Sequence, residues 1–348
     1  MYEVYIGGYQ SADRPGIHHL RFDSQTGRLM SIEGITGIEN PSYLYADWPR
    51  RHLYAASESD TRPRIFSYRI GHQGRLVLEN AEVSSGGSPC HLMQTPSGQA
   101  LLAANYQGAT IDWFPLSEDG RMAPSASQVR HVGRGLDNDR QSAAHPHSTW
   151  IDPSKQFVLA PDLGLDAIMV YRIDATSAKL DYVTRVNAPP GSGPRHLAFH
   201  PAGEYAYVVN ELGSMVSIYA YTADPFAMDY LDTVSTLPSG FGGTSAAAHI
   251  AIANDGTKLY ASNRGHDSLA VFRVDHQGRH IAPVTHVATA ARFPRHFALS
   301  PDQRWMLVVG QKADVVEVLR MVNGIPDAPG ALIEIPQPTV VVIGKPNP

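Results

Sequence analysis

The sequence predicts an all-β protein, a seven-bladed β-propeller with four antiparallel strands per blade. Apolar and polar residues alternate over short runs with almost no helical periodicity, which favours strands throughout. A block also recurs along the chain, most clearly where GPRHLAFHPAGEYAYVVNEL at 193–212 returns as FPRHFALSPDQRWMLVVGQK at 293–312. A repeat of about 50 residues that holds four strands is typical of a propeller blade.

Six blades can be followed directly, each from an anchor residue just before its first strand. The anchors are Pro41, Pro89, Pro146, Pro194, Ala247 and Pro294. Their successive spacings are 48, 57, 48, 53 and 47 residues. Seven residues after each anchor comes a turn residue, which predicts a hairpin into the second strand. These turn residues are Trp48, Pro96, Pro153, Pro201, Asn254 and Pro301.

The seventh blade can be assembled from the two ends of the chain. PQPTVVVIG, with its strand beginning at Pro338, supplies a first strand, and the N-terminal VYIGGY and GIHHLRF align with second and third strands. Closing the last blade with both termini removes an open sheet edge. We therefore expect one domain over residues 1–348.

The repeat places unusual residues at one mouth of the central channel, because the first strand starts where the antiparallel second strand ends. The first-strand starts are Ser42, Cys90, His147, Arg195, Ala248 and Arg295. The second-strand ends are Tyr9, Glu58, Tyr106, Leu163, Glu211, Arg264 and Gln311. Six of these thirteen are charged or histidine, although only 18% of the chain is charged.

This mouth is predicted to be a cationic pocket for a small anion. Arg195, Arg264 and Arg295 come from successive blades, and arginine suits both carboxylate and phosphate. His147 and Glu211 add groups capable of acid–base chemistry.

A polar insertion at 130–148, RHVGRGLDNDRQSAAHPHS, leads into His147 and is expected to cover the pocket. From the mouth and this loop we expect further substrate contacts. The candidates are Arg295, Gln311, Tyr106, Arg140 and His145.

Structural interpretations remain open for several of these residues. Arg195 and Glu211 could pair only to neutralise a channel end. Cys90 has no evident base and is expected to be a buried thiol. The HPH at 145–147 has no carboxylate-rich partner, so we expect no metal and no other cofactor.

A set of histidines recurs two residues past the anchors, and their ring nitrogens are expected to bond the backbone of neighbouring blades. Its members are His91, His196, His249 and His296.

Composition excludes several classes of partner. The formal charge is −5, there is one cysteine, and no apolar run reaches the ~18 residues of a membrane span. We expect no nucleic-acid or membrane partner and a cytoplasmic location without disulfides. The sequence leaves open whether the protein is a monomer or a homodimer.

Several segments resemble the seven-bladed propeller lactonases, which include propeller-type 6-phosphogluconolactonases and 3-carboxy-cis,cis-muconate lactonizing enzymes. They are GPRHLAFHP…YAYVVNEL, YASNRGHDSLAVF, RQSAAHPHS…APDLGLD and PRHFALSPDQRWMLVVGQ, and the likeness covers nearly the whole chain. By motif, the resemblance implies functional roles for a histidine, two arginines and a glutamate. These fall on His147, Arg195, Arg264 and Glu211.

Pattern and resemblance together predict a lactonase acting on a small anionic lactone, in particular hydrolysis of 6-phosphogluconolactone to 6-phosphogluconate. Either His147 or Glu211 would act as the base. One alternative is a lactonase or cycloisomerase for a carboxylated, muconate-type lactone. Another is a non-enzymatic propeller that binds a ligand or serves as a scaffold.

Overall fold

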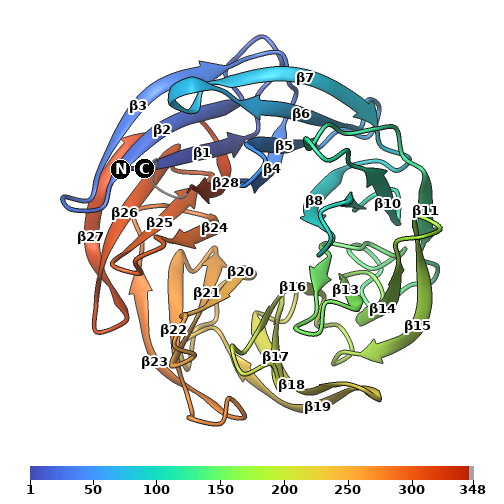
Figure 1. The fold of residues 1–348 in the computed structure, drawn as a ribbon. Helices are drawn as coiled ribbons and strands as arrows, with labels where there is room; N and C mark the ends of the chain where they lie inside the picture. Colours follow the sequence, from blue (N-terminus) through green and yellow to red (C-terminus); the bar gives the residue numbers. More distant parts are fainter. Residues whose placement is uncertain (345–348) are drawn as a thin grey trace.

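The computed structural model describes residues 1–344 and consists of seven four-stranded antiparallel sheets around a central channel (Figure 1). Six sheets form successive blades in chain order, as the anchor spacing predicts. Blade one contains β4 (Pro41–Asp47), β5 (His52–Ser57), β6 (Arg64–Ile70) and β7 (Leu76–Val83). Blade two contains β8 (Pro89–Gln94), β9 (Ala100–Asn105), β10 (Thr110–Pro115) and β11 (Ser127–Arg130). Blade three contains β12 (Trp150–Ile151), β13 (Phe157–Asp162), β14 (Ala167–Asp174) and β15 (Lys179–Asn187).

The remaining three chain-ordered blades follow the same plan. Blade four contains β16 (Pro194–Phe199), β17 (Tyr205–Asn210), β18 (Met215–Ala223) and β19 (Phe226–Ser235). Blade five contains β20 (Ala246–Ile252), β21 (Lys258–Arg264), β22 (Ser268–Val274) and β23 (Ile281–Ala288). Blade six contains β24 (Pro294–Leu299), β25 (Trp305–Gly310), β26 (Val315–Val322) and β27 (Ile325–Glu334).

The closing blade joins the two ends of the chain. It contains β28 (Pro338–Ile343), β1 (Tyr2–Gly8), β2 (Ile17–Asp23) and β3 (Arg28–Ile35), in the order β28-β1-β2-β3. Val341 pairs with Ile6 in the centre of the β28–β1 ladder. The first and last strands, β1 and β28, therefore lie side by side (Figure 1), and the predicted closure by terminal strands is confirmed.

The core lies between neighbouring blades, because each sheet is twisted and covers the face of the next. Between blades four and five, for example, Tyr207 and Val209 pack with Ile250 and Phe272, all essentially inaccessible to solvent. Apart from strands, residues 1–344 contain one short 3₁₀ helix, η1 (His72–Gly74). No helix in this range is long and apolar enough to cross a membrane.

Candidate functional site

β-bulges at the starts of inner strands aim several side chains into the channel mouth. In β16 the pairing register shifts between Pro194 and His196, so Arg195 is the extra residue. The same shift occurs in β24 around Arg295 and in β8 around Cys90. In five blades the residue before the first strand has a positive φ: Asn40 (44°), Ser88 (53°), Gly193 (65°), Phe293 (60°) and Gln337 (42°). A bulged residue is released from the ladder and can present its side chain to a site.

The ends of second strands supply the other half of the mouth. Glu211 follows β17, and its backbone N–H donates to the Gly193 carbonyl at 2.7 Å, which ties it to the start of β16. Arg264 ends β21, and its Nε donates to the Ala246 carbonyl at 3.3 Å. These contacts fix both side chains beside Arg195.

Ten residues line one cavity of about 270 Å³ at this mouth. They are Tyr9, Glu58, Cys90, Tyr106, Arg140, His147, Arg195, Glu211, Arg264 and Arg295. Seven of the nine predicted site residues are in this set. The other three are Tyr9, Glu58 and Cys90. The repeat predicts all three at the mouth, but they were not selected as site residues from the sequence.

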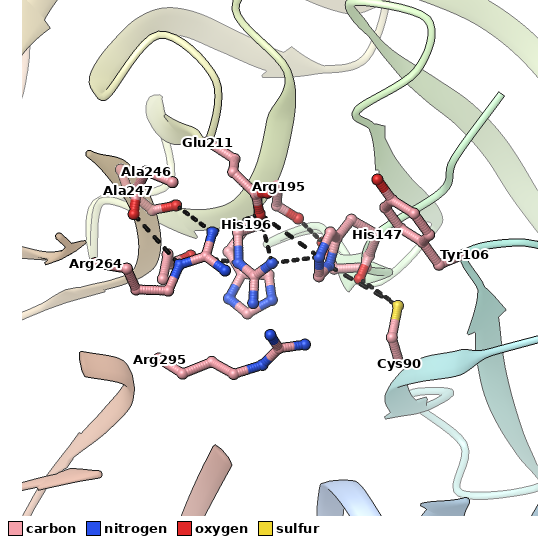
Figure 2. Close-up of polar contacts among 12 residues, drawn as sticks. Cys90, Tyr106, His147, Arg195, His196, Glu211, Ala246, Ala247, Arg264 and Arg295 are labelled. Carbon is pink, nitrogen blue, oxygen red and sulfur yellow. Dashed lines mark hydrogen bonds and ion pairs between the residues drawn. The ribbon is translucent and has the colours of Figure 1, made fainter. Parts of the chain in front are cut away.

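Glu211 is the centre of the charge network (Figure 2). Its Oε2 accepts from Nη1 of Arg195 at 2.7 Å and lies 2.7 Å from Nη2 of Arg264. Its Oε1 accepts from Nη2 of Arg140 at 2.7 Å. Both carboxylate oxygens are therefore occupied by guanidinium groups, in a side chain that is only 4% exposed.

Burial and neighbouring charges shift these groups in opposite directions. Burial alone would raise the pKa of Glu211, but Arg264, Arg195, His147 and Arg140 outweigh it and hold that pKa well below its usual range. Burial and the like charge of Arg264 lower the pKa of Arg195 to about 10. At neutral pH the pair is an ionised carboxylate with ionised arginines.

Both ring nitrogens of His147 have a polar neighbour. Its Nε2 contacts Nη1 of Arg195, and its Nδ1 lies 3.8 Å from Sγ of Cys90. Burial and the charge of Arg195 lower the pKa of His147 well below its ordinary value, so the ring is neutral. The lone pair on Nε2 is then the acceptor for the arginine N–H. Burial raises the pKa of the Cys90 thiol, which keeps it protonated, as expected for a buried thiol.

The opposite wall of the cavity carries a second, looser set of polar groups. Glu58 Oε2 accepts from the Tyr9 hydroxyl at 2.7 Å and lies 3.7 Å from Nη2 of Arg295. The Arg295 guanidinium also lies over the Tyr9 ring, 5.3 Å from its centroid. Within residues 1–344, the Arg295 side chain has this ion pair and this ring contact but no hydrogen bond, so its N–H donors are available to a ligand.

The insertion before His147 reaches the site through Arg140. Besides Glu211, Arg140 contacts the Tyr106 hydroxyl at 3.4 Å. Gln141, fully buried, fastens this part of the loop: its Nε2 donates to the Leu163 carbonyl at 2.8 Å and to Asp166 at 2.7 Å. Gln141 thus anchors the loop to blade three, although residues 132–140 themselves are mostly exposed.

Two predicted substrate contacts do not line the cavity. His145 is buried behind Tyr106, donating from Nδ1 to its carbonyl at 2.9 Å and stacking on its ring at 4.3 Å. Gln311 has the expected backbone position, with its N–H donating to the Phe293 carbonyl, but it is not among the residues that line the cavity, and its Oε1 is buried without a hydrogen-bond partner in the described residues. Repeat equivalence determines the backbone position, whereas local packing determines the direction of the side chain.

The recurrent histidines occupy the channel beneath the site and differ from the expectation. His91 accepts from the Thr149 backbone N–H of the next blade at 3.3 Å, as predicted. His196 and His249 instead share a hydrogen bond between their Nδ1 atoms at 2.8 Å, and His249 stacks on His296 at 3.8 Å. Most of these rings therefore bond or stack on each other rather than on backbone. Among residues 1–344, no cluster of three histidine, cysteine or acidic side chains is arranged to hold a metal ion.

A larger hollow of about 590 Å³ adjoins the cavity, because Arg264 lines both. Two exposed cations, Arg292 and Lys312, line its outer part, with Phe293 between Arg264 and Lys312. The ring centroid lies 5.3 Å from Cζ of Arg264 and 4.1 Å from Nζ of Lys312. Its lining holds three cationic side chains and one carboxylate, Asp267, so the hollow has a net positive charge beside the site.

Residues 3–343 match the family model described as Lactonase, 7-bladed beta-propeller. The chain belongs to this family. One similar protein, a 6-phosphogluconolactonase of Bacillus subtilis (strain 168), is 31% identical over 312 residues. The match covers 89% of this chain and 88% of that protein. A 6-phosphogluconolactonase of Pectobacterium carotovorum is 35% identical over 317 residues, covering 90% of each.

The solved structure of a periplasmic gluconolactonase from Pseudomonas aeruginosa superposes with a TM-score of 0.93. It is 30% identical and the match covers 99% of each chain. The predicted resemblance to propeller lactonases is therefore confirmed across the fold.

In this lactonase-family chain the cavity combines fixed positive charge, a neutral imidazole and two carboxylates. Guanidinium donors held in place by buried partners suit an oxygen on which negative charge develops. The same donors bind a carboxylate or phosphate on the ligand.

Proposed function

We propose that this protein hydrolyses a sugar-acid lactone, specifically 6-phosphogluconolactone to 6-phosphogluconate. The observation that carries the proposal is the cavity in which Glu211 holds Arg195 and Arg264 side by side while Arg295 keeps its donors uncommitted. Relatives named 6-phosphogluconolactonase and a structural relative named gluconolactonase support the reaction class.

In the proposed reaction the arginines stabilise the transition state. As water attacks the lactone carbonyl, negative charge collects on the carbonyl oxygen, and the guanidinium groups of Arg195 and Arg264 stabilise it. Their partners Glu211 and His147 keep them oriented before the substrate arrives, so little reorganisation is needed during the reaction. We therefore assign both of these residues to positioning.

The phosphate of the substrate is proposed to meet the cations that are not used on the carbonyl. Arg295 lies inside the cavity, and Arg292 and Lys312 line the adjoining hollow next to Arg264. A phosphate several bonds away from the carbonyl carbon could be held by this outer set while the lactone group sits against Arg195.

The test is a comparison of lactones against their spontaneous opening. Purified protein should accelerate 6-phosphogluconolactone hydrolysis well above the background rate, and glucono-lactone less. Faster turnover of a carboxylated, muconate-type lactone would move the substrate assignment to that class. If the protein accelerates the hydrolysis of none of these lactones, the proposed enzymatic activity is refuted and a ligand-binding propeller is the remaining interpretation.

A further inference from the structure

Two carboxylates face the candidate site, and they differ in how many partners they have. Glu211 has guanidinium donors on both oxygens and is 4% exposed. Glu58 is 20% exposed, and the Tyr9 hydroxyl and Arg295 both approach the same oxygen, Oε2. Within the described residues 1–344, Oε1 of Glu58 has no hydrogen-bond partner and is open to the cavity's solvent.

A group that accepts a proton from water needs a free lone pair and must tolerate becoming neutral. Protonation of Glu211 would leave three buried or half-buried guanidinium groups without their counter-ion. The lone pair of His147 is taken by Arg195, and its other nitrogen faces the Cys90 thiol. Glu211 and His147 are therefore poorly placed to accept a proton from water.

Glu58 meets these requirements and is held firmly enough to act. Its backbone N–H donates to the Asn40 carbonyl at 3.0 Å, which fixes the chain just after β5. Burial, helped by Glu58 itself, raises the pKa of Tyr9, so the phenol stays protonated and donates to Oε2. This hydrogen bond orients the carboxylate and leaves Oε1 for a water molecule.

We propose that Glu58 is the catalytic proton acceptor of this site, a role that rests on the lactone hydrolysis proposed above. Oε1 takes a proton from water as the water oxygen bonds to the carbonyl carbon and the C=O electron pair moves onto the oxygen facing the arginines. When the pair returns, the bond from carbon to the ring oxygen breaks, and the proton passes from Glu58 to that ring oxygen. The products are a hydroxyl and a carboxylic acid, which ionises to solvent.

The charged and titratable groups around Glu58 come from every neighbouring wall of the cavity. They are Tyr9, Cys90, Tyr106, Arg140, His147, Arg195, Glu211, Arg264 and Arg295. Four of these groups are arginines, so the acceptor lies in a cavity whose lining is mainly cationic.

The experiment compares Glu58→Gln with wild type on 6-phosphogluconolactone, with kcat and KM measured across pH. Loss of the acceptor should lower kcat by about 100-fold or more, leave KM nearly unchanged and abolish the fall in kcat toward acid. Glu39→Gln, an exposed carboxylate outside the cavity, is the matched control and should behave as wild type. Glu58→Asp should retain the fall in kcat toward acid but at a reduced kcat, since it keeps the carboxylate and places it one methylene farther from the substrate.

The remaining outcomes contradict either the role of Glu58 or the proposed function itself. Wild-type kcat in Glu58→Gln, or a raised KM alone, would make Glu58 a binding residue or a bystander. If Glu58→Gln fails to fold, Glu58→Asp decides: an unchanged kcat would overturn the proposal. Absence of lactone hydrolysis by the wild type would instead refute the proposed function, which the Glu58 variants by themselves do not address.

Discussion

Glu211 determines how the cationic residues of the site are arranged. Without it, Arg195 and Arg264 would be like charges in a buried place, and burial with mutual repulsion already lowers the pKa of Arg195 to about 10. Paired with Glu211 they remain charged and point at one volume. A carboxylate that organises arginines in this way is better suited to holding charge than to accepting protons.

Lys312 gives a residue-scale test of where the phosphate binds. It is exposed on the outer wall of the adjoining hollow and does not line the cavity itself. Lys312→Gln should therefore raise KM for 6-phosphogluconolactone several-fold while leaving kcat, and both constants for unphosphorylated glucono-lactone, unchanged. Steady-state kinetics on the two lactones measure this, and an equal effect on both substrates would argue against a phosphate subsite.

At the scale of elements, the inner-strand bulge connects the repeat to the site. Each bulge frees one residue from the ladder, and the same backbone position carries arginine in blades four and six but cysteine in blade two. The scaffold is thus uniform, while the chemistry is confined to a few substituted positions. The insertion at 130–148 adds Arg140, a charged side chain outside the repeat-equivalent positions, to the lining of the cavity.

Gln141 is the element-scale test of that insertion. Its side chain also accepts the backbone N–H groups of Leu136 and Asp137, at 3.1 and 3.0 Å, so it fastens the loop from inside. Gln141→Ala should loosen the loop, displace Arg140 from Glu211, raise KM and increase proteolytic cleavage within 131–141. Gln99→Ala, exposed in the turn between β8 and β9, is the control. Wild-type KM and protease resistance in Gln141→Ala would show that the loop does not depend on this anchor.

The sequence allowed most of the fold and much of the site to be predicted, for a physical reason. The pairing of strands and the position of a residue relative to its bulge follow from period-2 patterning and repeat spacing, which placed Arg195, Arg264 and Glu211 together. The direction of a side chain depends on neighbours distant in sequence, and for this reason Gln311 and His145 hold the expected backbone positions without lining the cavity. The availability of Glu58 also depends on such neighbours, Tyr9 and Arg295.

At the scale of the whole molecule, four blades contribute neutral histidines to one buried channel beneath the site. Burial is the main cause that lowers the pKa of His91, His196 and His249 well below the ordinary value, and it lowers that of His296 to about 3. Closely packed rings at 3.8 Å can be accommodated only while they are uncharged.

This packing predicts acid sensitivity of the entire propeller. Since the native pKa values lie below the unfolded value near 6.5, the full stability is present above that pH. As pH falls below it, the unfolded chain binds protons that the native channel does not, which costs about 1.4 kcal/mol per pH unit for each such histidine. Denaturant unfolding between pH 7 and 5 should show this decline, and His296→Gln should reduce its slope by about that amount. The exposed His276→Gln is the control, and equal slopes in all three proteins would contradict the account.

The most direct test of the central claim is the rate of 6-phosphogluconolactone hydrolysis by wild type, by Arg195→Ala and by Arg320→Ala, an exposed arginine on β26. The account predicts acceleration above spontaneous opening that is unaffected by chelator, lowered about 100-fold in Arg195→Ala and unchanged in Arg320→Ala. Thermal unfolding of each variant separates lost catalysis from lost folding. An Arg195→Ala protein that hydrolyses the lactone at the wild-type rate would contradict the role of the arginine network.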